Sequence, residues 1–83
     1  MTNTKLLREK ISASGYKISF IANQCGITYQ GFLKKLNNQT EFKASEMMIL
    51  RIILNLTDEE WEQIFFAKKE DLQSTKDKGE GGD

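Results

Sequence analysis

Hydrophobic residues recur along the chain with the spacing of helices. Leu7 and Ile11 lie four residues apart, and the stretch ISFIANQC at residues 18–25 follows the i, i+3, i+4, i+7 spacing of a helix with one buried face. The chain has no sustained two-residue alternation and no Asn-Gly or Asp-Gly hairpin turn. The pattern therefore predicts an all-α fold.

Capping residues and glycines divide this pattern into five helices. Thr4 can cap the first helix, Thr28 the third and Thr57 the fifth, while Gly15 and Gly26 suit the ends of the first two. We expect the first four helices at about residues 4–14, 18–25, 29–36 and 44–55, and the fifth after a capping box at residues 57–60. Because the run MMILRIIL is apolar on most sides, we expect the fourth helix to form the buried centre of the domain.

Length and composition limit the organisation of the chain. Its 83 residues suffice for one small domain, which we place at residues 1–69. Residues 70–83, EDLQSTKDKGEGGD, hold one large apolar residue, and we expect this tail to be disordered. The chain has no apolar run of bilayer length, no apolar core of a secretory signal near its N-terminus, and one cysteine. We therefore expect a cytoplasmic protein with no membrane partner.

Charge is distributed unevenly between the two halves of the chain. Residues 1–40 carry a net charge of +5 and residues 41–83 a net charge of −5, although the whole chain is neutral. No acidic residue occurs between Lys10 and Glu41. The first half can therefore face a polyanion such as nucleic acid.

The residues that most catalytic and metal sites require are missing. The chain has no histidine, a single cysteine and no glycine-rich phosphate loop, which excludes Ser-His and Cys-His dyads and a Cys/His zinc site. Cys25 falls on the apolar stripe of the second helix, where a core role is expected. We therefore expect no enzyme, no cofactor, no metal and no small-molecule ligand.

The segment SFIANQCGITYQGFLKKL at residues 19–36 has the pattern of a helix-turn-helix motif. A small residue, Ala22, allows a close helix crossing, Gly26 and Ile27 form the turn, and Phe32 anchors the second helix of the pair. With Phe32 and Leu36 directed inward, we expect Gln30, Gly31, Lys34 and Lys35 to point outward. Glutamine can pair with adenine and lysine can donate to guanine, so this face is suited to reading DNA.

These residues carry a resemblance to a known family. Residues 5–67 resemble the lambda-repressor-like helix-turn-helix domain of phage repressors and Cro proteins, in particular small phage-encoded regulators of Gram-positive bacteria. The resemblance implies a compact five-helix DNA-binding domain that binds a pseudo-palindromic operator as a homodimer, with the helix at residues 29–36 in the major groove. The residues that match the family are Ala22, Gly26, Ile27, Thr28, Phe32, Leu36, Asn37 and residues 57–61.

The resemblance also implies roles for individual residues. Base contacts are expected from Thr28, Tyr29, Gln30 and Lys34. Phosphate contacts are expected from Lys17, Ser19, Lys35, Lys43 and, in the polar connector at residues 37–43, from Asn37, Asn38, Gln39 and Thr40. The chain departs from the family at Ile18, where a phosphate-binding glutamine is common, at Lys35, where an apolar residue is common, and at Asn38, where glycine is common.

The sequence allows two interpretations of the biological role, which differ in the surface that binds the partner. Phe66 falls off the apolar stripe of Trp61, Ile64 and Phe65, which makes it a candidate for the dimer interface. The alternative to a DNA-binding regulator is an antirepressor-type protein that binds a larger phage regulator through its acidic second half and Phe66. Charge reversal, Lys34→Glu, is expected to abolish DNA affinity in the first case and to leave partner binding nearly intact in the second.

Overall fold

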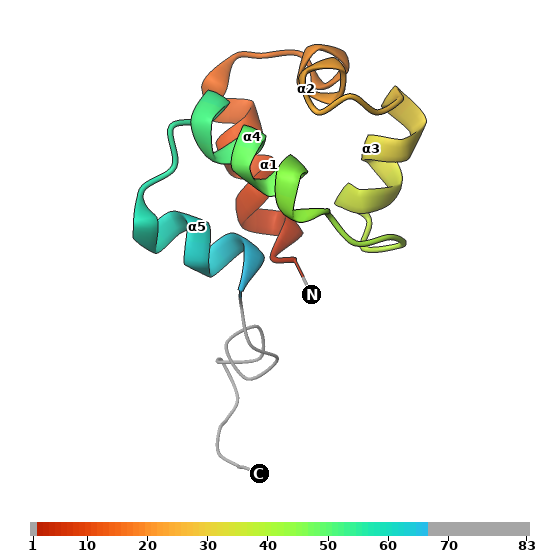
Figure 1. Ribbon diagram of the computed structural model, residues 1–83. Coiled ribbons are helices and arrows are strands. Elements are labelled where there is room, and N and C mark those ends of the chain that lie inside the picture. The colour runs from red at the N-terminus through yellow and green to blue at the C-terminus, as the bar shows by residue number, and fades with distance from the viewer. Residues whose placement is uncertain (1, 67–83) are drawn as a thin grey trace, which may run out of the picture.

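The computed structural model describes residues 2–66, which form five helices and no strand. The helices are α1 (Thr4–Ser14), α2 (Ile18–Gln24), α3 (Tyr29–Leu36), α4 (Ala44–Ile53) and α5 (Asp58–Phe65) (Figure 1). The prediction of an all-α fold with five helices is confirmed. The α4 helix ends two residues before the predicted limit, and Asn55 follows it in the left-handed conformation, with φ of 52°.

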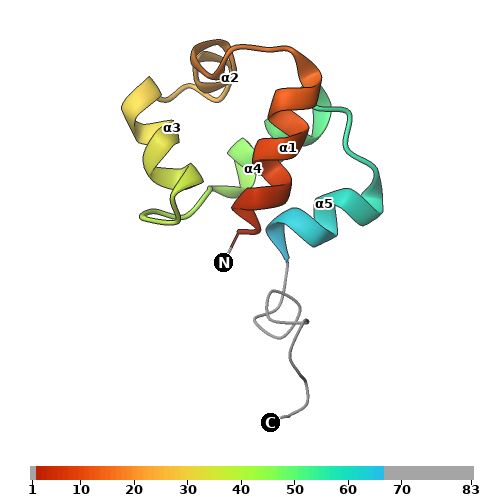
Figure 2. The same cartoon turned by 180° about the vertical axis from the view of Figure 1, so that it is seen from behind.

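The first helix lies between two others. In both views of the ribbon, α1 has α3 on one side and α5 on the other (Figures 1 and 2). Residues just before α1 bind both neighbouring regions, since the Asn3 N–H donates to the Ile64 carbonyl (2.7 Å) and Asn38 Nδ2 donates to the Thr2 carbonyl (3.1 Å). The α1 helix therefore connects the two ends of the domain.

Helix ends follow the sequence signals, with one correction. Gly15 and Gly26 take positive φ values of 80° and 74°, as their positions after α1 and α2 predicted. Thr57 and Glu60 form the predicted capping box at the start of α5. At α1, however, the cap is Asn3, whose Oδ1 accepts the Leu6 N–H (3.2 Å), while Thr4 is the first helical residue. Asparagine is as good an N-cap as threonine, so the signal lay one residue earlier.

The core consists of apolar side chains from all five helices and from the connector. Three aromatic rings meet at its centre, where Phe42 makes edge contacts with Phe32 (5.8 Å between centroids) and Phe65 (5.7 Å). The buried apolar residues are Leu7, Ile11, Ile21, Ala22, Phe32, Leu36, Phe42, Leu50, Leu56, Ile64 and Phe65. The connector residue Phe42 thus anchors the segment between α3 and α4 to the core.

The prediction that α4 forms the buried centre is wrong. Leu50 is fully buried, but Met48 is 47% exposed and Ile52 is 72% exposed. A domain of this size has too little mass to cover a helix on every side, so α4 keeps one face at the surface. The sequence of α4 is apolar on most sides and does not reveal which of its apolar faces is covered.

Two of the predictions from the sequence concern residues that the structure does not describe, and another concerns the membrane. The tail at residues 70–83, which we expect to be disordered, lies outside the described residues. The last residues of the predicted domain, 67–69, also lie outside them. None of the helices within residues 2–66 is long and apolar enough to cross a membrane.

Candidate functional site

The candidate site is built on α2, α3 and the turn at residues 25–28 that joins them. Ala22 is buried, and its carbonyl accepts the N–H of Ile27 (3.1 Å) from the turn. Gly26 supplies the left-handed residue that reverses the chain there. Thr28 then caps α3, because its Oγ1 accepts the Gly31 N–H (3.0 Å). The predicted left-handed turn at Gly26 and the predicted cap at Thr28 are confirmed, whereas a close helix crossing at Ala22 stays a prediction.

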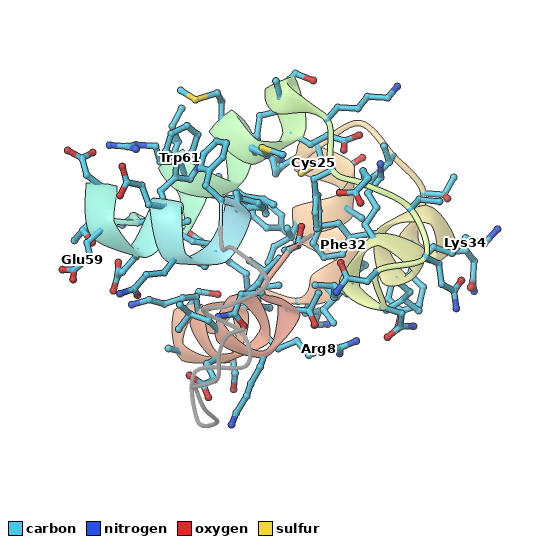
Figure 3. All side chains as sticks on the ribbon, turned by 90° about the horizontal axis from the view of Figure 1, so that it is seen from below. Arg8, Cys25, Phe32, Lys34, Glu59 and Trp61 are labelled. Carbon is cyan, nitrogen blue, oxygen red and sulfur yellow. The ribbon has the colours of Figure 1, made fainter. Side chains whose placement is uncertain are left out.

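The α3 helix has one buried face and one exposed face. Phe32 and Leu36 are buried, as predicted. Gln30 and Lys34 are exposed, and Tyr29 is 47% exposed. Figure 3 shows Phe32 directed into the domain and Lys34 extending away from it. The groups predicted to meet bases therefore reach solvent together on the outer side of α3.

The prediction that Lys35 points outward is wrong. Only 9% of Lys35 is exposed, and its Nζ lies 3.1 Å from Glu46 Oε1 and donates to the Glu41 carbonyl (2.9 Å). The cause is its register, since position 35 follows Phe32 by three residues and so shares the inward face of the helix. With its ammonium group already paired inside the protein, Lys35 is not placed to bind a phosphate.

The connector at residues 37–43 presents polar groups next to α3, and two of them have partners inside the protein. Asn37 Oδ1 accepts a hydrogen bond from Arg8 Nη2 (2.8 Å), and Asn38 donates to the Thr2 carbonyl. Asn38 has φ of 59°, so it tolerates the left-handed conformation that glycine often supplies. Gln39 and Thr40 are exposed, and their side chains form no hydrogen bond within residues 2–66. Of the connector residues predicted to bind phosphates, Gln39 and Thr40 are therefore the ones whose side chains have no hydrogen-bond partner within residues 2–66.

The other predicted phosphate partners lie at helix starts. Lys17 precedes α2 and Lys43 precedes α4, and Ser19 is the second residue of α2. All three are exposed. Within residues 2–66, neither Lys17, Lys34 nor Lys43 forms an ion pair, so their charges remain available to an anionic ligand.

Acidic side chains gather at the opposite end of the domain. The first turn of α5 contains Asp58, Glu59 and Glu60, and Figure 3 places Glu59 at the far end of the molecule from Lys34. Lys10 pairs with Glu60 and Arg51 with Asp58, so two of the acids there neutralise nearby cations. Glu59 forms no ion pair within residues 2–66, so an exposed, unpaired acid remains at this end, far from Lys34.

Comparison of the chain with protein-family models, with curated proteins and with solved structures gave no match. Within the described part of the chain, no group of three or more His, Cys, Asp or Glu side chains is placed to hold a metal ion. The outer side of α3 and the connector offer lysine, amide and hydroxyl groups, together with the carboxylate of the exposed Glu41.

Two residues near the site were not singled out from the sequence. Arg8 binds the end of α3 through the Leu36 carbonyl (3.4 Å) and Asn37, and Glu46 holds Lys35. Glu46 stands at the third position of α4, where a carboxylate can accept the N–H before the helix, and it accepts that of Lys43 (2.8 Å). The position of Glu46 three residues after Lys43 could have predicted this hydrogen bond. The contact of Arg8 with Asn37, 29 residues away in the chain, has no counterpart in the local sequence pattern.

Two further residues considered from the sequence are Cys25, which is partly buried, and Phe66, which is exposed. Cys25 is partly buried against the core, and burial raises the pKa of its thiol to about 11, with Glu46 acting in the same direction and Lys35 opposing it. A thiol with such a pKa is protonated at neutral pH and is a weak nucleophile. Phe66 is 55% exposed and contacts Trp61 edge-on (5.0 Å), and its place in a dimer interface stays a prediction.

Proposed function

We propose that the protein is a sequence-specific regulator of transcription that binds double-stranded DNA, of the phage Cro or repressor type. The observation that carries this proposal is the division of α3 into a buried face and an exposed face bearing Tyr29, Gln30 and Lys34. In a helix-turn-helix protein such a face enters the major groove, where amide and ammonium groups distinguish bases.

Backbone contacts would come from groups that surround α3. Lys17, Ser19, Gln39, Thr40 and Lys43 are exposed and can bind phosphates, which fix the position of the helix on the duplex. Thr28 can add a contact through its hydroxyl proton, since its Oγ1 already accepts the Gly31 N–H. A single small domain contacts few base pairs, so two copies on a pseudo-palindrome, about one helical turn apart, would supply specificity.

Two variants with the same change in net charge test the proposal. Lys34→Gln removes a cation from the exposed face of α3, and Gln63→Glu adds an acid on the exposed side of α5. Loss of one base contact costs about 1–3 kcal/mol, which corresponds to a fall in affinity of about 5- to 150-fold. We expect that fall for Lys34→Gln in binding to duplexes selected from a random pool, and less than a twofold change for Gln63→Glu. Equal effects of the two variants would contradict a specific role for α3.

A second candidate function is an antirepressor-type protein that binds a larger regulator. The observation that favours it is the exposure of Met48 and Ile52, which lie one turn apart on the outer face of α4, together with Phe66. Charge reversal separates the two functions. Lys34→Glu should abolish DNA affinity if α3 reads DNA, and should leave a protein partner bound if the apolar residues form the working surface.

A further inference from the structure

The last turn of α3 contains a buried ion pair. Lys35 is 9% exposed and Glu46 is 3% exposed, and Lys35 Nζ lies 3.1 Å from Glu46 Oε1. The two residues belong to different helices, α3 and α4, on either side of the connector. Both are therefore placed to determine how the connector lies against α3.

Both members of the pair also bind the backbone of the connector. Lys35 Nζ donates to the Glu41 carbonyl (2.9 Å), and Glu46 Oε1 accepts the Lys43 N–H (2.8 Å). Between these two points Phe42 is buried, and its ring centroid lies 5.9 Å from Lys35 Nζ. The pair thus binds the connector backbone on both sides of Phe42, which is itself anchored in the core.

Stability alone does not explain charges at this place. Removing a carboxylate and an ammonium group from water is costly, and replacing a buried ion pair by apolar side chains of similar size is often neutral or stabilising. The surroundings are partly apolar, since the ring of the buried Phe42 lies close to Lys35. Directional hydrogen bonds to backbone groups are what an apolar pair would lack.

The buried face of α3 determines where Lys34 points. Phe32 and Leu36 are buried on the same side of the helix as Lys35, whereas Lys34 lies outside this face and is exposed. The backbone N–H of Gln39 donates to the Lys34 carbonyl (2.9 Å), which continues the connection into the exposed part of the connector. The connector that Lys35 and Glu46 bind at Glu41 and Lys43 is therefore also hydrogen-bonded to the backbone of Lys34.

We propose that Lys35 and Glu46 form a positioning pair, which holds the connector in register with the exposed face of α3 so that both bind one DNA duplex. This proposal rests on the proposed DNA binding, but its first consequence, a fixed connector, does not need DNA. Lys35 acts from inside the protein and contributes no phosphate contact.

The test replaces both charges at once and compares the result with a matched pair. In Lys35→Met/Glu46→Leu the buried pair and the carboxylate that accepts the Lys43 N–H are lost. In the control, Lys10→Met/Glu60→Leu, an ion pair is also lost, together with the carboxylate that accepts the Thr57 N–H (2.9 Å) at the start of α5. The two double variants therefore remove the same groups from different places.

The first readout is amide hydrogen exchange without DNA, followed by NMR. We expect the Gln39 N–H, whose own acceptor is untouched, to exchange about tenfold faster in Lys35→Met/Glu46→Leu, with global stability similar to that of the unchanged protein. The control should leave this amide unchanged. Unchanged exchange of Gln39 in the first variant would overturn the proposal, whatever the protein does with DNA.

The second readout is DNA affinity as a function of salt. We expect the first variant to bind selected duplexes about tenfold more weakly with an unchanged slope of log affinity against log salt. A lysine that contacts a phosphate contributes about 0.9 to that slope, so a decrease of this size would show that Lys35 binds DNA directly and would overturn the positioning role.

Two further outcomes keep the test decisive. If the unchanged protein binds no duplex while Gln39 exchange still rises in the variant, the proposed function fails and the fixed connector stands. Lys35→Met/Glu46→Gln keeps an oxygen that can accept the Lys43 N–H while removing both charges. This variant replaces Lys35→Met/Glu46→Leu in the exchange measurement if the latter does not fold. The same acceleration of Gln39 is expected there, and its absence would contradict the proposal.

Discussion

The guanidinium group of Arg8 donates to Asn37 Oδ1 (2.8 Å) and, from the same Nη2 atom, to the Leu36 carbonyl (3.4 Å). This contact joins the first helix to the end of α3, where a cation also interacts favourably with the exposed carbonyl groups of the helix. The arrangement makes Arg8 a structural support for the helix that carries the proposed DNA-reading groups.

Removing this support should lower stability by a measurable amount. We expect Arg8→Met to lower the free energy of unfolding by about 1 kcal/mol, since it deletes charge-assisted hydrogen bonds at the surface. Lys5→Met is the control, because Lys5 is exposed on the same helix and forms no ion pair within residues 2–66. Urea denaturation compares the two variants. Equal free energies of unfolding would contradict the claim that Arg8 stabilises the end of α3.

The turn between α2 and α3 gives a second prediction. Gly26 has φ of 74° with no atom within 4 Å of an added Cβ, so Gly26→Ala meets only backbone strain. We expect a loss of about 1–2 kcal/mol in the free energy of unfolding. The same methyl group in Gly31→Ala enters a helical backbone, where its Cβ would lie 3.1 Å from Thr28 Oγ1 and its helix propensity would offset that contact. A larger loss for Gly31→Ala would refute this account of the turn.

The exposure of α4 gives a third prediction. Leu50→Ala should cost about 2–5 kcal/mol in the free energy of unfolding, because Leu50 is fully buried. Ile52→Ala should change it by less than about 0.5 kcal/mol, because the side chain is 72% exposed. Denaturation at two protein concentrations checks this contrast. Comparable losses that depend on protein concentration would mean that a second copy covers Ile52 in solution.

The capping box of α5 predicts a dependence of stability on pH. The hydrogen bond from Lys10, followed by that from the Thr57 N–H, lowers the pKa of Glu60 from its usual value of 4.5. Below pH 4.5 the unfolded chain therefore binds the proton more readily than the folded protein does, so this contribution is complete above pH 4.5 and is lost as pH falls through the lower folded pKa.

The corresponding variant is Glu60→Gln, which cannot titrate. Its stability should lie below that of the unchanged protein near neutral pH, and the two should converge as the solution becomes acidic. Thermal denaturation between about pH 2.5 and pH 6 measures the difference. A difference that stays constant over that interval would show that the ionised form of Glu60 contributes nothing.

The helices were predictable because their signals are local. Thr28, Gly26 and the capping box at Thr57 act through neighbouring residues, and each lies where the sequence placed it. The charge of Lys35 favours an exposed position, whereas its place three residues after Phe32 puts it on the buried face of the helix. Its partner Glu46 lies on another helix, α4, so no local pattern around Lys35 reveals the ion pair.

Other features depend on contacts that no local pattern carries. Ile52 and Leu50 are equally apolar in the sequence, and only the packing of the whole domain decides that one is exposed and the other buried. Asn37 and Asn38 were expected to face phosphates, yet they meet Arg8 and Thr2 from the other end of the described chain. Gln30 and Lys34 were predictable as exposed groups, whereas what they bind remains the subject of the proposal.

The most direct test of sequence-specific DNA binding is selection of bound duplexes from a random-sequence pool at moderate salt, with affinity for the selected duplexes then measured against salt. We predict enrichment of a two-fold-symmetric site with half-sites about one helical turn apart, and a steep decrease of affinity with salt. Weak binding without enrichment of any sequence would contradict the account and would leave α3 as a structural element of a protein that acts through a protein partner.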